Sequence, residues 1–224
     1  MKRESGFTLT EMMVALVLLL ALSMLVSYGA QRLRANANQS LCLTNLRNLS
    51  SGLYSHAADH NGSLMPRVAG SLVPWPPVID AYLGGNGLSF NAHTITSRTW
   101  ACPENKTLVN AFQRNGRAEA FNTGYPINRH LTKSSDGFTY GIPMAQVRQP
   151  AQKVYVIESC RLSDGAFGPA TTMAYTPYGY SGWMKQVHPR GNHVLFCDGH
   201  VEPVAASHEL CSKTVSVSGP WWLP

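Results

Sequence analysis

Residues 1–30 read MKRESGFTLTEMMVALVLLLALSMLVSYGA. Within them, residues 12–26 form an apolar run that is interrupted only by Ser23. As an α-helix with a rise of about 1.5 Å per residue, residues 7–28 span about 33 Å, close to the roughly 30 Å hydrocarbon thickness of a bilayer. The segment therefore predicts one membrane-spanning helix and argues against a fully soluble cytosolic enzyme.

A secretory signal peptide is a second explanation for a basic and then apolar amino terminus. Such a peptide has an apolar core of about 7–15 residues followed by small residues at its cleavage site, and residues 21–30 contain small side chains that fit. Glu11 lies inside the apolar segment, where a carboxylate costs at least about 2.5–3.5 kcal/mol and by default marks a functional site. For an isolated glutamate the simpler explanation is the helix macrodipole, which favours an acid at a helix start.

The residues around this glutamate form a longer pattern. Gly6 to Glu11 reads GFTLTE, with basic Lys2 and Arg3 before it and the apolar run after it. This pattern resembles the processing site of type IV pilins and type II secretion pseudopilins. The resemblance implies that a membrane-bound prepilin peptidase cleaves after Gly6 and that the new terminal residue, Phe7, is N-methylated. It also implies that Glu11 meets the terminal amine of a neighbouring subunit during assembly.

The same resemblance implies a fold, partners and a location. The fold is a pilin-like α+β fold, in which a long amino-terminal helix packs on an antiparallel β-sheet head. The function is that of a structural subunit of a secretion pseudopilus or pilus-like fibre, not an enzyme. The partners are the prepilin peptidase, other pilin subunits and an inner-membrane assembly platform. The chain would cross the inner membrane once, with a cytoplasmic amino terminus and a periplasmic head.

The chain divides into four expected regions: a leader at 1–6, a membrane and assembly half of the helix at 7–30, an amphipathic half at 31–61, and a head at 62–224. The amphipathic half is predicted from helically spaced apolar residues that would pack on the core, namely Leu33, Ala37, Leu41, Leu46, Leu49 and Leu53. Asn61-Gly62 predicts the end of the helix, since both residues tolerate the left-handed conformation.

Short elements are expected in the head. Pro76-Pro77 predicts the start of a short helix that Gly84-Gly85 ends, and residues 153–158 alternate as a strand does. A weaker strand candidate is residues 94–100. The clearest signal is Asp198-Gly199 between two strand-like runs, which predicts a hairpin with a two-residue type I′ turn and positive φ at both turn residues.

Nine residues separate His188 from Asp198-Gly199. This spacing resembles the prepilin-type processing-associated H-X9-DG domain, although Pro189, Arg190, Asn192 and Cys197 depart from its usual residues. Further segments that agree with it are CLTNLR at 42–47, WACP at 100–103 and YPIN at 125–128. A strand over residues 193–197 extends about 17 Å, so His188 and Asp198 are expected at opposite ends of the hairpin, in loop and turn roles.

No cofactor and no metal site are expected. The alternative left open is a calcium ion in the head, as the resemblance to major pseudopilins implies, with His193 and His200 facing an ion beside Asp198. Calcium requires several oxygen ligands, and acidic residues are sparse in this region.

Five cysteines give an odd count in a head expected outside the cytoplasm, where disulfides persist. Two bridges among five cysteines allow fifteen arrangements, so the sequence leaves the connectivity open. We expect a bond between Cys42 and Cys102, which would tie the helix to the head, and a buried Cys197. No two cysteines are close in sequence, which argues against zinc.

Charge and aromatic content bear on the partners. The formal net charge is +6, only 13% of residues are charged and no basic run occurs, so no nucleic-acid partner is indicated. Without the leader, the charge becomes 16 − 11 = +5. A different function, a membrane-tethered carbohydrate-binding module, is suggested by aromatic residues that could stack on sugars: Trp75, Trp100, Tyr175, Tyr178, Tyr180, Trp183, Trp221 and Trp222. Packing of these rings in the core or a subunit interface is the favoured explanation.

Overall fold

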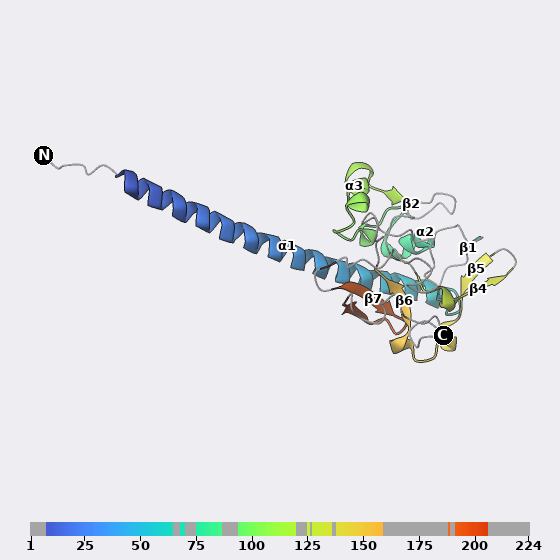
Figure 1. Ribbon diagram of the computed structural model, residues 1–224. Coiled ribbons are helices and arrows are strands. Elements are labelled where there is room, and N and C mark those ends of the chain that lie inside the picture. Colours follow the sequence, from blue (N-terminus) through green and yellow to red (C-terminus); the bar gives the residue numbers. More distant parts are fainter. Residues whose placement is uncertain are drawn as a thin grey trace. The chain divides into compact units, whose positions relative to one another are not determined.

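The structure combines a long amino-terminal helix with short antiparallel strands, which confirms the predicted α+β architecture (Figure 1). It is a computed structural model that describes residues 8–64, 68–69, 75–86, 94–119, 125, 127–135, 138–158, 188 and 191–205. The chain forms two compact units, Met1–Ala37 and Asn38–Pro224. Each unit is treated by itself below.

Helix α1 extends over Leu9–Asp59, 51 residues in all. It ends where Asn61 and Gly62 take left-handed φ values of 53° and 74°. The Gly62 amide donates a 2.7 Å hydrogen bond back to the Ala57 carbonyl, which satisfies one of the carbonyls that a helix end leaves open. The helix end predicted from Asn61-Gly62 is thereby confirmed.

In the first unit, α1 presents apolar side chains to its surroundings. Large apolar residues from Leu9 to Leu33 are all more than half exposed. Among the described helices, α1 is the one that is long and apolar enough to cross a membrane, and its apolar window is not buried. This is the surface that the predicted membrane-spanning segment requires.

In the second unit, one side of α1 enters the core. The buried residues are Cys42, Asn45, Leu46, Leu49, Ser50, Gly52, Leu53, His56 and Ala57. Their steps of three and four residues are typical of a helix with one face packed on a core. The expected stripe was too long, because Leu33 and Leu41 are 71% and 50% exposed. Burial along the helix begins at Cys42.

Three small antiparallel sheets make up the described strands. Their orders are β1-β5-β4, β2-β3 and β6-β7-β8. The strands are β1 (Val68–Ala69), β2 (Thr94–Ile95), β3 (Ala118–Glu119), β4 (Thr132–Ser135), β5 (Phe138–Gly141), β6 (Val154–Ile157), β7 (Asn192–Phe196) and β8 (Val201–Val204). Short 3-10 turns connect them: η1 (Ala81–Leu83), η2 (Arg98–Trp100), η4 (Arg129–Leu131), η5 (Met144–Gln146) and η6 (Pro150–Gln152).

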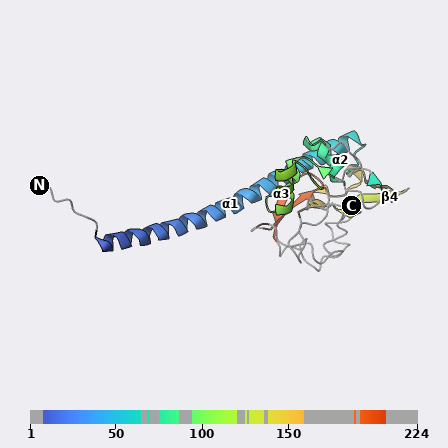
Figure 2. The same cartoon turned by 90° about the horizontal axis from the view of Figure 1, so that it is seen from above.

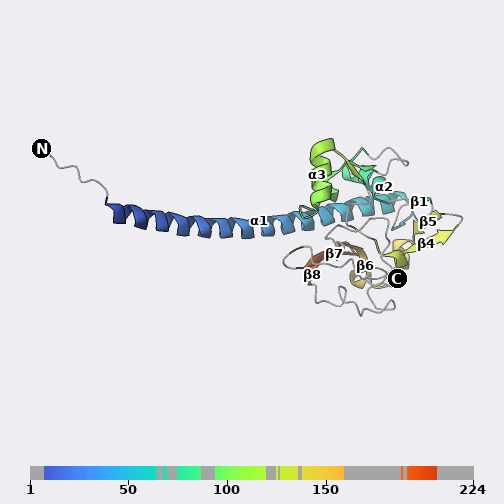
Figure 3. The ribbon, with the colours of Figure 1, turned by 45° about the horizontal axis from the view of Figure 1, so that its top comes forward.

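Sheet β6-β7-β8 lies beside the second half of α1 (Figures 1 and 3). Strand β6 confirms the strand predicted at 153–158, but all four of its residues are buried. Alternating exposure does not occur because successive side chains point to opposite faces of the strand and both faces of β6 are buried. Both edges are also paired, by β7 and by a bridge between Ile127 and Val156. The sheet therefore belongs to the core.

Helices α2 (Pro76–Asp80) and α3 (Lys106–Asn115) lie beside the carboxyl-terminal half of α1 (Figures 1 and 2), and α3 runs across the direction of α1 (Figures 1 and 3). The helix predicted from Pro76-Pro77 is confirmed, and Gly84 closes the following η1 with a φ of 73°. This region packs so closely on α1 that a Cβ at Gly52 would lie 2.7 Å from Leu83 Cδ2.

The weak strand candidate at 94–100 is wrong beyond Ile95. Only Thr94–Ile95 is a strand, and the chain then turns into η2, where Ser97 Oγ accepts a hydrogen bond from the Thr99 amide. The whole turn is organised by Asp80, which is fully buried. Its carboxylate accepts four hydrogen bonds of 2.8–2.9 Å, from the Thr96 amide and hydroxyl, the Ser97 amide and Trp100 Nε1.

Candidate functional site

Two places in the described chain bring together polar residues that the sequence singles out. The first is the start of α1. The Thr8 amide and hydroxyl each donate a 2.8 Å hydrogen bond to Glu11 Oε2, and the Glu11 amide donates to Thr8 Oγ1 at 3.3 Å. This reciprocal pair is a capping box, in which the residue before the helix and the third helical residue satisfy each other's open amides. Glu11 is thus held on the first turn of α1.

Two further predicted residues belong to this first place. Gly6 and Phe7, the two sides of the expected cleavage, lie outside the described residues. The capping box could have been read from the sequence, because Thr8-Leu9-Thr10-Glu11 has the required Thr-x-x-Glu spacing before an apolar run.

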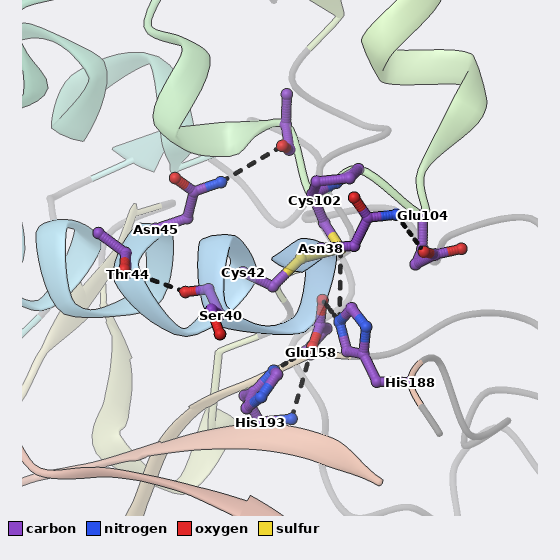
Figure 4. The surroundings of a disulfide bond; sticks show 12 residues. Asn38, Ser40, Cys42, Thr44, Asn45, Cys102, Glu104, Glu158, His188 and His193 are labelled. Atoms are coloured by element: carbon purple, nitrogen blue, oxygen red, sulfur yellow. Dashed lines mark hydrogen bonds and ion pairs between the residues drawn. A yellow bond between two sulfur atoms is a disulfide. The ribbon is translucent and has the colours of Figure 1, made fainter. Parts of the chain in front are cut away.

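The second place is a buried cluster around the bond that joins Cys42 on α1 to Cys102 after η2 (Figure 4). These are the two cysteines that were expected to form a bond. His188 Nε2 lies 3.6 Å from Cys102 Sγ and 3.2 Å from Glu158 Oε1. His193 Nδ1 on β7 lies 2.9 Å from Glu158 Oε2, so one carboxylate joins both histidines. All five residues are 0–1% exposed.

The cluster holds a charged carboxylate away from water. Burial by itself raises the pKa of Glu158, but hydrogen bonds from His188 and His193, and the smaller electrostatic effect of these imidazoles, outweigh it, so the pKa is lowered. Burial, with a smaller contribution from the Glu158 charge, raises the pKa of the nearby Tyr125 hydroxyl. The site is therefore an anionic centre lined by two imidazoles and two sulfurs.

Local backbone geometry explains how His188 reaches this centre. The Gly191 amide donates to the His188 carbonyl at 3.0 Å, which fixes the His188 backbone beside the start of β7. Gly191 has a φ of 116°, and a Cβ there would lie 2.1 Å from the Val204 carbonyl oxygen. Only glycine fits this position. The loop role expected for His188 is incomplete, since the side chain is also a buried partner of Glu158.

The other end of the H-X9-DG motif forms a separate contact. Asp198 Oδ1 lies 2.5 Å from His200 Nδ1 on the exposed side of the hairpin. Gly199 packs on α1, where a Cβ would lie 3.1 Å from Tyr54 Cε2, and Tyr54 donates a hydrogen bond to the Cys197 carbonyl. As expected, His188 and Asp198 do not pair. In the alternative left open, His193 would face an ion with His200 and Asp198, but the His193 Nδ1 atom contacts Glu158 Oε2 instead.

The hairpin turn also differs from the expected type. Strands β7 and β8 are present, but only Gly199 has a positive φ, at 94°, whereas a type I′ turn requires one at Asp198 too. The Gly199 amide donates to the Phe196 carbonyl and the Phe196 amide to the His200 carbonyl, both at 3.0 Å. The loop is therefore three residues long, which needs a single left-handed glycine.

Comparison with known proteins concerns the amino terminus. Residues 1–27 match the family model described as the prokaryotic N-terminal methylation motif. A search of curated proteins and a search of solved structures found no match to the chain. The methylation motif indicates a pilin-type protein that a prepilin peptidase processes, and it suggests a structural subunit rather than an enzyme. Together with the apolar part of α1, the motif fits a membrane-anchored protein.

The structure describes some of the candidate aromatic residues and cysteines, and others lie outside the described residues. Trp75 and Trp100 are at most 1% exposed and pack edge to face with ring centroids 5.4 Å apart, so they belong to the core. The other aromatic residues named as sugar-stacking candidates lie outside the described residues. Cys197 is a free, buried thiol whose pKa is raised to about 12 by burial and by Asp198, while Cys160 and Cys211 lie outside the described residues.

Proposed function

We propose that this chain is a pilin-type subunit that is cleaved after Gly6, N-methylated on Phe7 and assembled through Glu11 into a type II secretion pseudopilus or a pilus-like fibre. The observation that carries the proposal is the match of residues 1–27, which leads into a helix whose apolar side chains are exposed. Exposed apolar surface of this kind requires lipid or other helices around it. In a fibre of such subunits, neighbouring helices surround the apolar side chains.

The geometry of Glu11 supports its role in assembly. Both hydrogen bonds from Thr8 go to Oε2, so Oε1 takes no part in the capping box. Cleavage after Gly6 creates an ammonium group on the residue next to Thr8. In apolar surroundings, an unpaired carboxylate is costly and an amine from a neighbouring subunit offsets its charge. The capping box presents the carboxylate to that partner.

The disulfide supports the proposed location of the second unit. Disulfides persist in oxidising compartments and are rare in the cytosol, so the Cys42–Cys102 bond favours a periplasmic or extracytoplasmic head. The amino terminus is then cytoplasmic, where an assembly platform in the inner membrane and the prepilin peptidase would meet the chain.

Replacing Gly6 with leucine is expected to leave all of the protein uncut, because the proposed peptidase site requires a small residue before the bond. Intact-mass measurement of the purified chain, produced together with a prepilin peptidase, would show the six-residue leader retained. Gly29→Leu is the matched control, since a Cβ at Gly29 meets no atom within 4 Å. A Gly6→Leu protein that still begins with methylated Phe7 would contradict the proposed site.

Replacing Glu11 with glutamine is expected to reduce cross-linked oligomers by about tenfold or more, a loss of at least about 1.4 kcal/mol in association. Glutamine keeps an oxygen that can accept the Thr8 hydrogen bonds but has no charge. Thr8→Val is the matched control, because it removes the hydroxyl from the capping box and keeps the carboxylate. Both variants should be cleaved normally. If Glu11→Gln assembles like the wild type, the pilin signal serves only for membrane placement, as in the binding-module alternative.

A further inference from the structure

The cluster around Cys42 and Cys102 has the composition of a metal site as well as that of a disulfide. One ligand atom from each of Cys42, Cys102, Glu158 and His188 lies within 4.8 Å of the other three. The four side chains come from α1, the segment after η2, the end of β6 and position 188 ahead of β7, and they converge on one point (Figure 4). All four are buried, so water does not compete for them.

The ligand types select zinc among common ions. Zinc binds cysteine thiolates at about 2.3 Å, imidazole nitrogen at about 2.0–2.1 Å and carboxylate oxygen at about 2.0–2.2 Å, in a closed tetrahedral shell of four ligands. Calcium takes six to eight oxygen ligands, and this cluster offers one carboxylate. A supporting partner is also in place, because His193 Nδ1 lies 2.9 Å from Glu158 Oε2 and would orient the carboxylate toward an ion.

Disulfide and zinc are mutually exclusive uses of the same sulfurs, since zinc requires thiolates. We propose that the reduced second unit binds one zinc ion through Cys42, Cys102, His188 and Glu158, and that formation of the Cys42–Cys102 bond releases it. In the oxidation, the two thiolates give two electrons to the disulfide of a second, oxidising protein. That disulfide takes up two protons and becomes a dithiol. The Cys42–Cys102 bond forms and the zinc ion leaves with its two positive charges. The ion thus stabilises the fold before the bond exists.

Zinc offsets the charge that thiolate formation creates in the core. With both cysteines as thiolates and Glu158 ionised, the cluster carries three negative charges in a buried site. A divalent cation reduces this to one, and His193 donates to the same carboxylate. Without an ion, burial favours the neutral thiol form of both cysteines. Zinc binding therefore releases two protons from the reduced pair.

The test compares the oxidised and reduced forms of the full chain in detergent. The protein is reduced by a water-soluble phosphine in denaturant, then transferred without oxygen into buffer with zinc or cobalt. We expect about one zinc per reduced chain by elemental mass spectrometry, and less than about a tenth of that in the oxidised chain. Cobalt in the reduced chain should give a thiolate-to-metal charge-transfer band. Equal zinc in both forms, or none in the reduced form, would overturn the proposal.

Variants separate ligands from bystanders. Cys42→Ser and His188→Ala should lose the stoichiometric ion, while His193→Ala should weaken zinc binding by about 10–100-fold by freeing the Glu158 carboxylate. His200→Ala is the matched control, since His200 also contacts a carboxylate, Asp198, but lies on the surface. A Cys160→Ser/Cys211→Ser double variant should bind zinc like the wild type. Loss of the ion in that double variant would assign the site to other cysteines.

Discussion

An Asp80→Ala variant is expected to lose about 3–5 kcal/mol of unfolding free energy, a large part of the stability of a domain of this size. The carboxylate has no exposed surface and accepts four hydrogen bonds from residues 96–100. Removing it takes the acceptor from the buried Ser97 amide and Trp100 indole N–H, and from the half-buried Thr96 amide and hydroxyl. Each buried donor that loses its acceptor costs about 1–3 kcal/mol, reduced where the chain relaxes.

Urea unfolding of the full chain in mild detergent, followed by tryptophan fluorescence, measures this loss. Asp80→Asn should fall between wild type and Asp80→Ala, because one amide oxygen still accepts but the amide N–H2 faces donors. Asp59→Ala is the matched control, since Asp59 is exposed and accepts only the Tyr82 hydroxyl at 3.1 Å among the side-chain bonds of the described residues. It should change stability by less than about 1 kcal/mol. A loss of that size for Asp80→Ala would show that Asp80 does not organise the turn.

A Cys42→Ala/Cys102→Ala double variant is expected to be less stable than the oxidised wild type by about 4 kcal/mol. The bond closes a loop with a sequence separation of 60 residues, and the entropy that such a loop removes from the unfolded chain corresponds to this value. The same unfolding measurement serves, in metal-free buffer so that an ion cannot compensate. Cys197→Ala controls for the loss of a buried thiol, because Cys197 is buried without a bond. A difference below about 1 kcal/mol would show that the bond adds little to the fold.

Local signals in the sequence predicted the helical part of this fold well. The apolar run and Asn61-Gly62 gave α1 and its end to within two residues, because helix length and termination depend on neighbouring residues. The start of a short helix at Pro76-Pro77 and its end at Gly84 were predicted correctly for the same reason. Helix α3 was missed, although Asn105 caps its start and Gly116 closes it with a φ of 66°.

Long-range contacts account for what the sequence did not show. Glu158 is separated by 30 and 35 residues from its partners His188 and His193, and nothing in its own segment marks it as a site residue. The cysteines gave no zinc signal because zinc motifs are recognised by close spacing, while Cys42 and Cys102 meet only in the fold. The turn at Asp198-Gly199 was placed correctly but given the wrong length, since a single glycine fits both loop types.

The position of the disulfide along α1 has a mechanical consequence. Cys42 is the first buried residue of the helix, ahead of Leu46, Leu49 and Leu53, which pack in the core. A pull directed along α1 toward its amino terminus therefore reaches a covalent crosslink before it loads the apolar contacts. Tension carried by a fibre of such helices would pass through the disulfide into the segment at Cys102. It would not pull α1 away from the core against its apolar contacts alone.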